Sequence, residues 1–342
     1  MEEGVRLAPY TTLRVGGNAR AFVTAETDER LVDLVAGADR RGEPVLILGG
    51  GSNLLISDAG FDGLVIRVGT RGVVIDGGLV TAAAGEDWDP LVERCVAEGL
   101  SGIECLSGIP GLVGSTPIQN VGAYGQDVSQ TVVAVRVFDR HARETLDLEA
   151  ADCGFAYRDS AFKGALDRFV VLSVTYRLKT DGLSRPLAYA ELAKSLGVVP
   201  GERVPLAQAR AKVLELRRGK GMVLDPSDPD TISAGSFFTN PILGKAQADA
   251  LEELAPGYPR WPAEDGAVKV PAAWLIEHAG FRKGHAKGPV RLSTKHTLAL
   301  TNPTGRASAD DLIELAREVR DGVKAKFGVT LVNEPVMVGV SL

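Results

Sequence analysis

Cysteine and histidine are scarce in this sequence. Three cysteines (Cys95, Cys105 and Cys153) form an odd set without C-x-x-C spacing, which favours buried thiols in a reducing compartment over a disulfide framework. The four histidines show no H-x-x-x-H or similar spacing, so we expect no metal site. No apolar run approaches membrane-spanning length, and the N-terminus lacks a signal-peptide region. These absences predict a cytoplasmic protein without membrane insertion.

An excess of basic residues is also missing. The chain has 38 lysines and arginines against 44 acidic residues, a net charge of −6, which argues against a broad nucleic-acid-binding face. No G-x-x-x-x-G-K-[ST] motif occurs, which argues against a P-loop NTPase. A length of 342 residues, 45% of them hydrophobic, allows two or three globular domains. Nothing in the sequence indicates an obligatory protein partner.

Two glycine-rich loops are the most informative feature of the chain. The first is Gly49–Asn53, and the second lies within Gly108–Gly125. Glycine lets the backbone approach a ligand closely, and exposed N–H groups with the Ser115 and Thr116 hydroxyls suit phosphate oxygens. Neither loop fits G-x-G-x-x-G, because Leu54 stands where the third glycine of the first loop would be. Either loop alone could be a simple turn, but together they predict a long ligand with a pyrophosphate, such as a dinucleotide.

The hydrophobic pattern predicts an α+β chain. Apolar alternation and turn signals predict strands at residues 21–24, 45–48, 64–68, 73–84 (a hairpin), 132–138, 169–178 and 330–340. Helical spacing predicts helices from about residue 27, at 89–99, at 206–217 and from 308 to 327. Ser308 and Asp311 form a capping-box pattern at the start of the last helix. The turn-rich residues 224–230 indicate a domain boundary.

Three residues could carry chemistry. Arg158 lies in a polar island and could either clamp a carboxylate or pair with Asp159. Ser236 lacks the G-x-S-x-G elbow of hydrolases, so it is either a turn residue or a proton donor to a carbanion. Glu334 stands in the apolar final strand, where it either faces water or acts as an acid. None of the three is decisive alone.

These segments together resemble the UDP-N-acetylenolpyruvoylglucosamine reductase family. The motifs that carry the resemblance span nearly the whole chain in the family's order, at residues 11–17, 48–54, 109–125, 157–160, 235–241, 269–280 and 333–335. The resemblance implies three domains. Residues 1–70 and 71–222, the latter joined by the C-terminal strand 329–342, would hold FAD as in the vanillyl-alcohol-oxidase flavoproteins, and 223–328 would bind the substrate.

The resemblance also implies the reaction. NADPH would reduce the enolpyruvyl ether of UDP-N-acetylglucosamine enolpyruvate to UDP-N-acetylmuramate, a step of peptidoglycan precursor synthesis, with noncovalent FAD as the hydride carrier. Ser236 would be the proton donor, and Arg158 and Glu334 would stabilise the developing charge. The alternative is a related FAD-dependent sugar or alcohol oxidase, against which the joint presence of these three residues argues.

Binding residues follow from the same resemblance. The FAD contacts would be Gly49, Gly50, Gly51, Ser52, Asn53, Leu54, Gly114, Ser115, Thr116, Gln119, Asn120, Gly122, Ala123, Tyr124 and Gly125. The substrate contacts would be Tyr189, Lys220, Asn240 and, as a weaker candidate, Arg217. Tyr189 would lie on a loop that reaches over the substrate. Because the segment from Ser184 lacks a strong apolar period before Leu192, we expect a mobile loop or a loop–helix junction with too few apolar contacts to pin it.

Overall fold

The computed structural model describes all residues, Met1–Leu342. They form two compact units, each discontinuous in sequence. The first comprises residues 1–5, 19–50 and 62–219, and the second residues 6–18, 51–61 and 220–342. Both units contain helices and separate small sheets, which confirms the predicted α+β class. The three-domain division with its boundaries stays a prediction.

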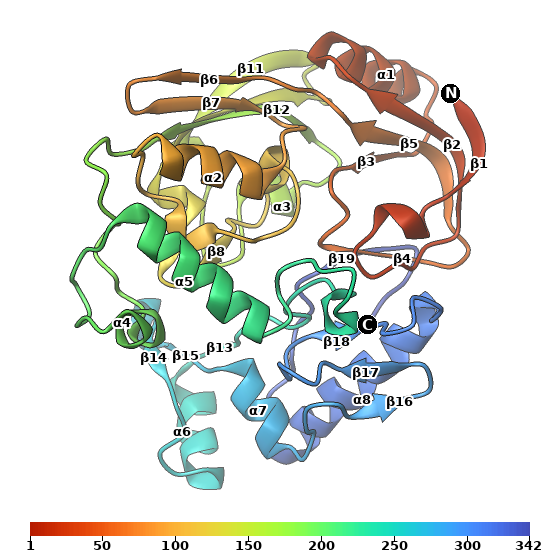
Figure 1. Ribbon diagram of the computed structural model, residues 1–342. Coiled ribbons are helices and arrows are strands. Elements are labelled where there is room, and N and C mark those ends of the chain that lie inside the picture. Colours follow the sequence, from red (N-terminus) through yellow and green to blue (C-terminus); the bar gives the residue numbers. More distant parts are fainter. The chain divides into compact units, whose positions relative to one another are not determined.

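The first unit holds two larger sheets and one two-stranded sheet (Figure 1). The four-stranded sheet has the order β1 (Glu2–Arg6), β2 (Asn18–Ala25), β5 (Phe61–Val68) and β3 (Val45–Leu48). The five-stranded antiparallel sheet has the order β11 (Glu144–Glu149), β10 (Val132–Asp139), β12 (Phe169–Arg177), β7 (Leu79–Ala83) and β6 (Val73–Asp76). A short hairpin joins β8 (Gly122–Ala123) to β9 (Gln126–Asp127).

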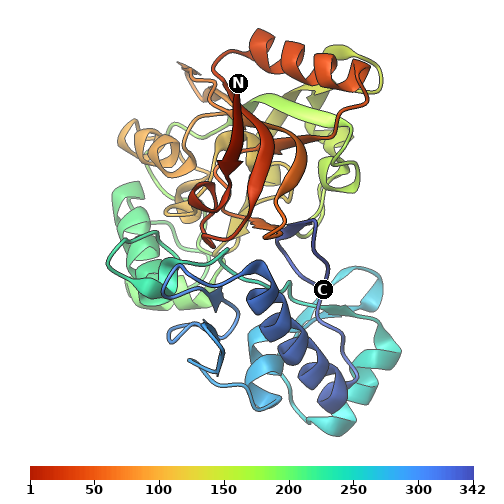
Figure 2. The same ribbon diagram turned by 90° about the vertical axis from the view of Figure 1, so that its right-hand side faces the viewer.

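Helix α1 (Asp28–Arg40) shows why the sequence folds locally as predicted. The Thr27 hydroxyl caps it by accepting a hydrogen bond from the Arg30 N–H at 3.1 Å. Two acidic residues occupy its first turn, where the helix dipole favours negative charge. Its buried face shares one hydrophobic core with the neighbouring strands. Figure 2 shows α1 beside the dark red strands β1 and β2.

Four further helices belong to the first unit: α2 (Trp88–Ala97), α3 (Ala161–Gly164), α4 (Ala190–Leu196) and α5 (Leu206–Gly219). A small separate core that includes Cys105, Leu187, Leu192 and Val213 packs around α4 and α5. Arg210 of α5 is buried and binds the Asp89 carboxylate of α2 in bidentate fashion, at 2.6 and 3.0 Å. The Asp89 carboxylate also accepts the Gly108 N–H, so this pair holds the start of the second glycine-rich loop.

The second unit has its own hydrophobic core. Its helices are α6 (Lys245–Leu254), α7 (Ala272–His278) and α8 (Ala309–Phe327). Its strands are β4 (Leu54–Ile56), β13 (Ile242–Leu243), β14 (Trp261–Pro262), β15 (Val268–Lys269), β16 (Ala286–Lys287), β17 (Val290–Leu292), β18 (Leu300–Thr301) and β19 (Val336–Val338). The capping box predicted for α8 is confirmed, and Gly328 ends that helix in the left-handed conformation.

The final strand is shorter than predicted. The sequence predicts residues 330–340, whereas β19 covers only Val336–Val338, paired in parallel with β4. Pro335 has no N–H to donate to a ladder and restricts Glu334 before it, so regular pairing begins only after the proline. Glu334 therefore lies in an irregular segment rather than within the strand.

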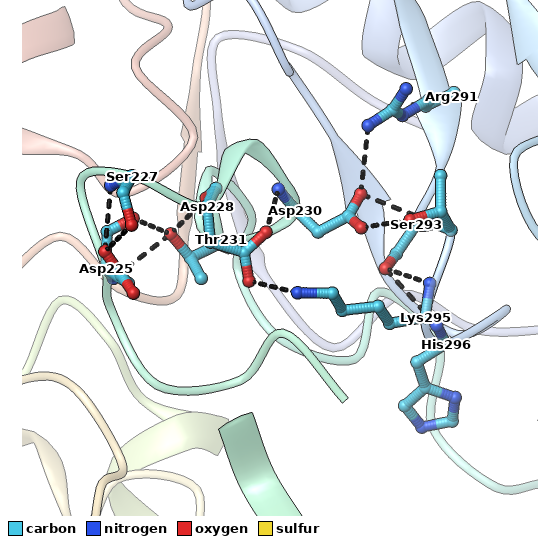
Figure 3. A network of polar contacts seen from close by, with 10 residues as sticks. Asp225, Ser227, Asp228, Asp230, Thr231, Arg291, Ser293, Lys295 and His296 are labelled. Carbon is cyan, nitrogen blue, oxygen red and sulfur yellow. Dashed lines mark hydrogen bonds and ion pairs between the residues drawn. The ribbon is translucent and has the colours of Figure 1, made fainter. Parts of the chain in front are cut away.

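The turn-rich residues 225–231 are held by a polar network rather than left as a loose linker (Figure 3). Asp230 is 2% exposed and accepts hydrogen bonds from the Arg291 guanidinium at 3.2 Å and from the Thr294 N–H and hydroxyl. Lys295 donates to the Asp228 carboxylate at 2.5 Å. The network ties this segment to β17 and the turn after it, within the second unit.

Candidate functional site

The two glycine-rich loops meet in the first unit. A methyl group on Gly49 would lie 2.8 Å from the Ser115 Oγ, and one on Gly50 would lie 2.8 Å from the Gly111 Cα. Both distances are shorter than ordinary Cβ contacts, and at Gly50 the neighbouring atom is backbone that cannot rotate away, so the approach there requires glycine. A backbone-lined cradle of this kind, with a serine hydroxyl in it, fits a diphosphate-containing cofactor such as FAD. Gly51 and the residues up to Leu54 belong to the second unit.

Two side chains predicted to contact the cofactor also hold the second loop together. The Thr116 hydroxyl donates to the Val113 carbonyl at 2.8 Å and shares a hydrogen bond with the Tyr176 hydroxyl. The Asn120 amide donates to the Ala156 carbonyl at 3.0 Å and accepts from the Ser129 N–H at 3.1 Å. Their contact with FAD stays a prediction. Because both side chains already make hydrogen bonds within the protein, we expect the main-chain atoms of Thr116 and Asn120 to make most of that contact.

Arg158 is brought to the same loop. It lies in a tight turn closed by two hydrogen bonds between Ala156 and Asp159, and its φ of 55° is in the left-handed region. Its guanidinium donates to the Gly122 carbonyl at 2.6 Å and to the Asn120 carbonyl at 3.3 Å. The Asp159 carboxylate, the structural partner that the sequence left open for Arg158, accepts a hydrogen bond from the Ser160 N–H. Lys163 donates to the Arg158 carbonyl at 2.8 Å and fixes the turn.

A second buried cation lies near Arg158. Arg217, at the end of α5, is 8% exposed and donates to the Gly108 carbonyl at 3.4 Å. Burial lowers its pKa to about 10, and the positive charge of Arg158 acts in the same direction, while Tyr124 and Asp89 oppose the shift. The group therefore stays charged at neutral pH. Two guanidinium groups beside one glycine-rich loop provide a binding site for an anionic ligand.

Tyr189 lies at the N-cap of α4, with 41% of its surface exposed. Its ring meets the edge of the Tyr124 ring at 5.4 Å between centroids. Burial raises the pKa of Tyr124 to about 12, so that phenol stays neutral at physiological pH. The predicted substrate residue and the predicted FAD loop are therefore in direct contact within the first unit.

Tyr189 lies at a loop–helix junction, as the sequence allows, but the expectation that too few contacts would pin the loop is wrong for residues 184–187. Ser184 is fully buried and Leu187 is 2% exposed. The Ser184 and Leu187 N–H groups donate to the carbonyls of Val204 and Glu202, and Arg203 donates to the Ser184 carbonyl at 2.7 Å. The hydrophobic pattern of the sequence gave no sign of this anchoring, because the anchoring comes mostly from backbone hydrogen bonds. The exposed positions lie at both ends of this range, at residues 182–183 and 188–190, and at Pro186 between them.

Ser236 and Glu334 come together in the second unit. The Glu334 N–H donates to the Phe237 carbonyl at 2.8 Å, and Phe238 forms an antiparallel bridge with Asn333. The Phe237 N–H donates to the Leu298 carbonyl, and both phenylalanine rings are buried, so the Ser236 backbone is firmly held. Both site residues are themselves half-buried.

The end of the first glycine-rich loop contacts the same segment. The Asn53 amide donates to the Glu334 carbonyl at 3.3 Å, and the Val336 N–H donates to the Asn53 carbonyl at 2.9 Å. The predicted FAD residues Asn53 and Leu54 thus lie beside the predicted acid. This adjacency was not evident from the sequence, because 280 intervening residues separate the two segments.

The other two predicted substrate residues also belong to the second unit. Asn240 accepts the Ala272 N–H at the start of α7, which leaves its Nδ2 as the group for a ligand. Lys220 immediately precedes Gly221, where a methyl group would lie 3.1 Å from the Cβ of the buried Asp230. The polar network of Figure 3 therefore packs directly against the turn that carries Lys220.

Comparisons with known proteins agree with this arrangement. Residues 19–145 match a family model described as an FAD binding domain, and residues 226–338 match the C-terminal domain of UDP-N-acetylenolpyruvoylglucosamine reductase. The chain is 58% identical over 352 residues to UDP-N-acetylenolpyruvoylglucosamine reductase of Thermobifida fusca (strain YX), with 99% of this chain and 98% of that one covered. The chain belongs to the UDP-N-acetylenolpyruvoylglucosamine reductase family.

Two further relatives support the assignment. The Streptomyces coelicolor reductase of the same name is 56% identical, with 98% of this chain and 90% of the relative covered. The crystal structure of UDP-N-acetylenolpyruvylglucosamine reductase from Thermus caldophilus is 28% identical, covers 98% of both chains and has a TM-score of 0.69. The fold is therefore that of the family along the whole chain. None of its helices combines the length and apolar character needed to cross a membrane.

Proposed function

We propose that this chain catalyses the NADPH-dependent reduction of UDP-N-acetylglucosamine enolpyruvate to UDP-N-acetylmuramate in peptidoglycan precursor synthesis. The observation that carries the proposal is the 58% identity, over 99% of the chain, to a reductase of that name. The geometry agrees with it, since two guanidinium groups and a glycine-lined cradle suit a reaction between anionic nucleotides.

The residues present fit FAD. Gly49, Gly50 and Ser115 would hold its diphosphate in the cradle, together with the main chain of Gly114 and Thr116. Bound FAD supplies the hydride chemistry, accepting a hydride from NADPH and giving one to the substrate's vinyl carbon. The protein itself orients the reactants and stabilises charge.

The proposed catalytic residues act on the substrate's enolpyruvyl group. Arg158 and Glu334 stabilise the negative charge that develops on its carboxylate and adjacent carbon. Ser236 donates a proton to that carbon, because a hydroxyl is acidic enough to protonate a carbanion. The UDP diphosphate is bound by four further residues: Lys220 and Arg217 as charged donors, Tyr189 as a phenolic donor, and Asn240 through its amide.

A cytoplasmic location is part of the proposal. The three cysteines are unpaired and buried, as expected of a protein kept in a reducing compartment. The enzyme would then bind both of its nucleotide substrates, NADPH and UDP-N-acetylglucosamine enolpyruvate, in the cytoplasm.

Substrate dependence tests the function. With purified holoenzyme, NADPH oxidation should require UDP-N-acetylglucosamine enolpyruvate and should proceed under anaerobic conditions. The product should be UDP-N-acetylmuramate by mass spectrometry. Oxygen consumption with a sugar or alcohol, without need for the enolpyruvyl compound, would support the oxidase alternative and contradict the proposal.

FAD should be bound noncovalently. No histidine or cysteine lies in either glycine-rich loop, and Cys105, the nearest thiol, is 2% exposed with its pKa raised by burial. Acid precipitation of the holoenzyme should release all the yellow colour into the supernatant. Flavin absorbance that stays with the precipitated protein would contradict this prediction.

Tyr189→Phe should weaken substrate binding selectively. The change removes only the phenolic hydroxyl, so the KM for the enolpyruvyl sugar should rise by an amount equivalent to ~1.5–3 kcal/mol if that hydroxyl binds a charged phosphate oxygen. Flavin reduction by NADPH should hardly change. The matched control is Tyr258→Phe, which removes a hydroxyl bound to the Ala248 carbonyl in the second unit. Equal KM values in both variants would make Tyr189 a structural residue.

A further inference from the structure

Glu104 is a fully buried carboxylate to which the proposed reaction gives no role. It lies in the short helical turn Glu104–Leu106, just before the second glycine-rich loop. Its side chain accepts hydrogen bonds from the Gly102 N–H at 2.6 Å, the Arg185 N–H at 2.7 Å and the Gln126 amide at 2.8 Å. A buried carboxylate is costly unless it is hydrogen-bonded, and these three bonds meet that need without a cation among the donors.

Two of the three donors come from segments of the proposed site. Gln126 directly follows Gly125, the last residue of the second glycine-rich loop, and its amide oxygen also accepts the Cys105 N–H at 2.9 Å. Arg185 lies four residues before Tyr189. One carboxylate oxygen, Oε1, therefore joins the end of the cofactor loop to the beginning of the segment that carries the substrate tyrosine.

The same two segments touch again at Tyr189 itself. Gly125 has a φ of 84°, and a methyl group on it would lie 3.3 Å from the Ala188 Cβ and 3.6 Å from the Tyr189 nitrogen. The rings of Tyr124 and Tyr189 meet edge to face. Residues 185–189, which we call the tyrosine segment, are thus fixed to the cofactor loop at both ends.

We propose that Glu104 is a positioning residue that holds the tyrosine segment against the cofactor loop, so that the Tyr189 hydroxyl is already placed for the substrate diphosphate. The inference rests on the proposed function for the role of Tyr189, whereas the contact of Glu104 with Arg185 and Gln126 is independent of it. A glutamine at this position leaves one carbonyl oxygen for the three donors and turns an NH2 group towards at least one of them, which weakens the hold on the segment at its base. Preorganisation of a binding group lowers the cost of ordering it when the substrate binds.

A double-mutant cycle tests the proposal. Glu104→Gln should raise the KM for the enolpyruvyl sugar by roughly tenfold, the scale of a lost hydrogen bond to a charged group. It should leave flavin reduction by NADPH near the wild-type rate. In the Tyr189→Phe background the same change should raise KM by less than about twofold, because contacts that act through one group are not additive. Additive effects on KM would overturn the proposal.

The matched control is Asp139→Asn. Asp139 is 2% exposed in the same unit and, like Glu104, accepts backbone N–H groups, from His141 and Ala142, in addition to Arg168. The same carboxylate-to-amide change there should lower thermal stability without raising the KM for the sugar. If Glu104→Gln fails to fold, Gln126→Leu carries the test, because it removes the amide donor while leaving Glu104 in place.

Hydrogen exchange provides a readout that does not depend on the reaction. In the holoenzyme without sugar, Glu104→Gln should speed exchange by tenfold or more at the amides of Arg185 and Leu187, which donate to the Glu104 carboxylate and the Glu202 carbonyl, whereas Asp139→Asn should not. Wild-type exchange in Glu104→Gln would overturn the positioning role. A wild-type enzyme that never reduces the enolpyruvyl sugar would instead defeat the proposed function and leave this contact to be judged by exchange alone.

Discussion

Replacement of Ser236 by alanine should separate the two half-reactions of the holoenzyme. Bleaching of the bound flavin by NADPH should proceed at nearly the wild-type rate, because no substrate proton moves in that step. Return of the flavin colour on addition of the enolpyruvyl sugar should slow by roughly 10²–10⁴-fold, the usual scale for loss of a general acid. Stopped-flow absorbance measures both rates in one preparation.

The structure suggests a control in the same segment. Ser233 is 5% exposed and its hydroxyl accepts the Gly235 N–H at 3.3 Å, so it stabilises the turn that leads to Ser236. Ser233→Ala should lower stability without changing the ratio of the two half-reaction rates. If Ser236→Ala slowed both half-reactions equally, Ser236 would be a structural residue like its neighbour, and the proton-donor assignment would be wrong.

Local signals in the sequence predicted the regular elements well. The start of the helix near residue 27, the hairpin across residues 76–78 and the Ser308 capping box each depend on residues within a few positions of one another, and each is present. The final strand failed for the opposite reason. Its apolar alternation was real, but Pro335 and the distant partner β4 decide where pairing begins.

The tyrosine segment shows the same limit. Its sequence has little apolar periodicity, which predicts a mobile loop or a loop–helix junction. Its anchors are the buried Glu104 and the Glu202 carbonyl, and Ser184 just before it is held by the Arg203 side chain and the Val204 carbonyl, all distant along the chain. A carboxylate between Ile103 and Cys105 in an apolar stretch was the one available signal, since such a group is expensive to bury without a purpose. The pattern gave no indication of its partners.

The candidate site was predicted because each of its segments carries distinctive residues. Glycines mark the loops, and their close approach in the structure explains why no other residue fits at Gly50. The sequence could not show which of these segments lie next to one another in the folded chain. The contacts of Arg158 with the second loop, and of Glu334 with both Asn53 and Phe237, arise only from the folded chain.

Replacement of Glu334 by glutamine should spare flavin reduction and damage the reaction with the enolpyruvyl sugar. Glutamine keeps the size of the side chain and can still donate a hydrogen bond. It cannot share a proton with a carboxylate that gains charge in the transition state. We therefore expect a loss of about 3 kcal/mol or more in kcat/KM for the sugar, the scale for removal of one preorganised transition-state contact.

The backbone contacts of Glu334 make this variant informative. Its N–H and carbonyl are bound to Phe237 and Asn53 through main-chain atoms of Glu334, so the amide substitution leaves these bonds in place. The same chemical change at Glu318 of α8, whose carboxylate binds His285 and Lys287 at 2.8 and 3.0 Å, is the matched control and should leave the sugar reaction unchanged. Wild-type turnover in Glu334→Gln would mean that this carboxyl faces solvent, and that the charge on the substrate is stabilised by Arg158 without it.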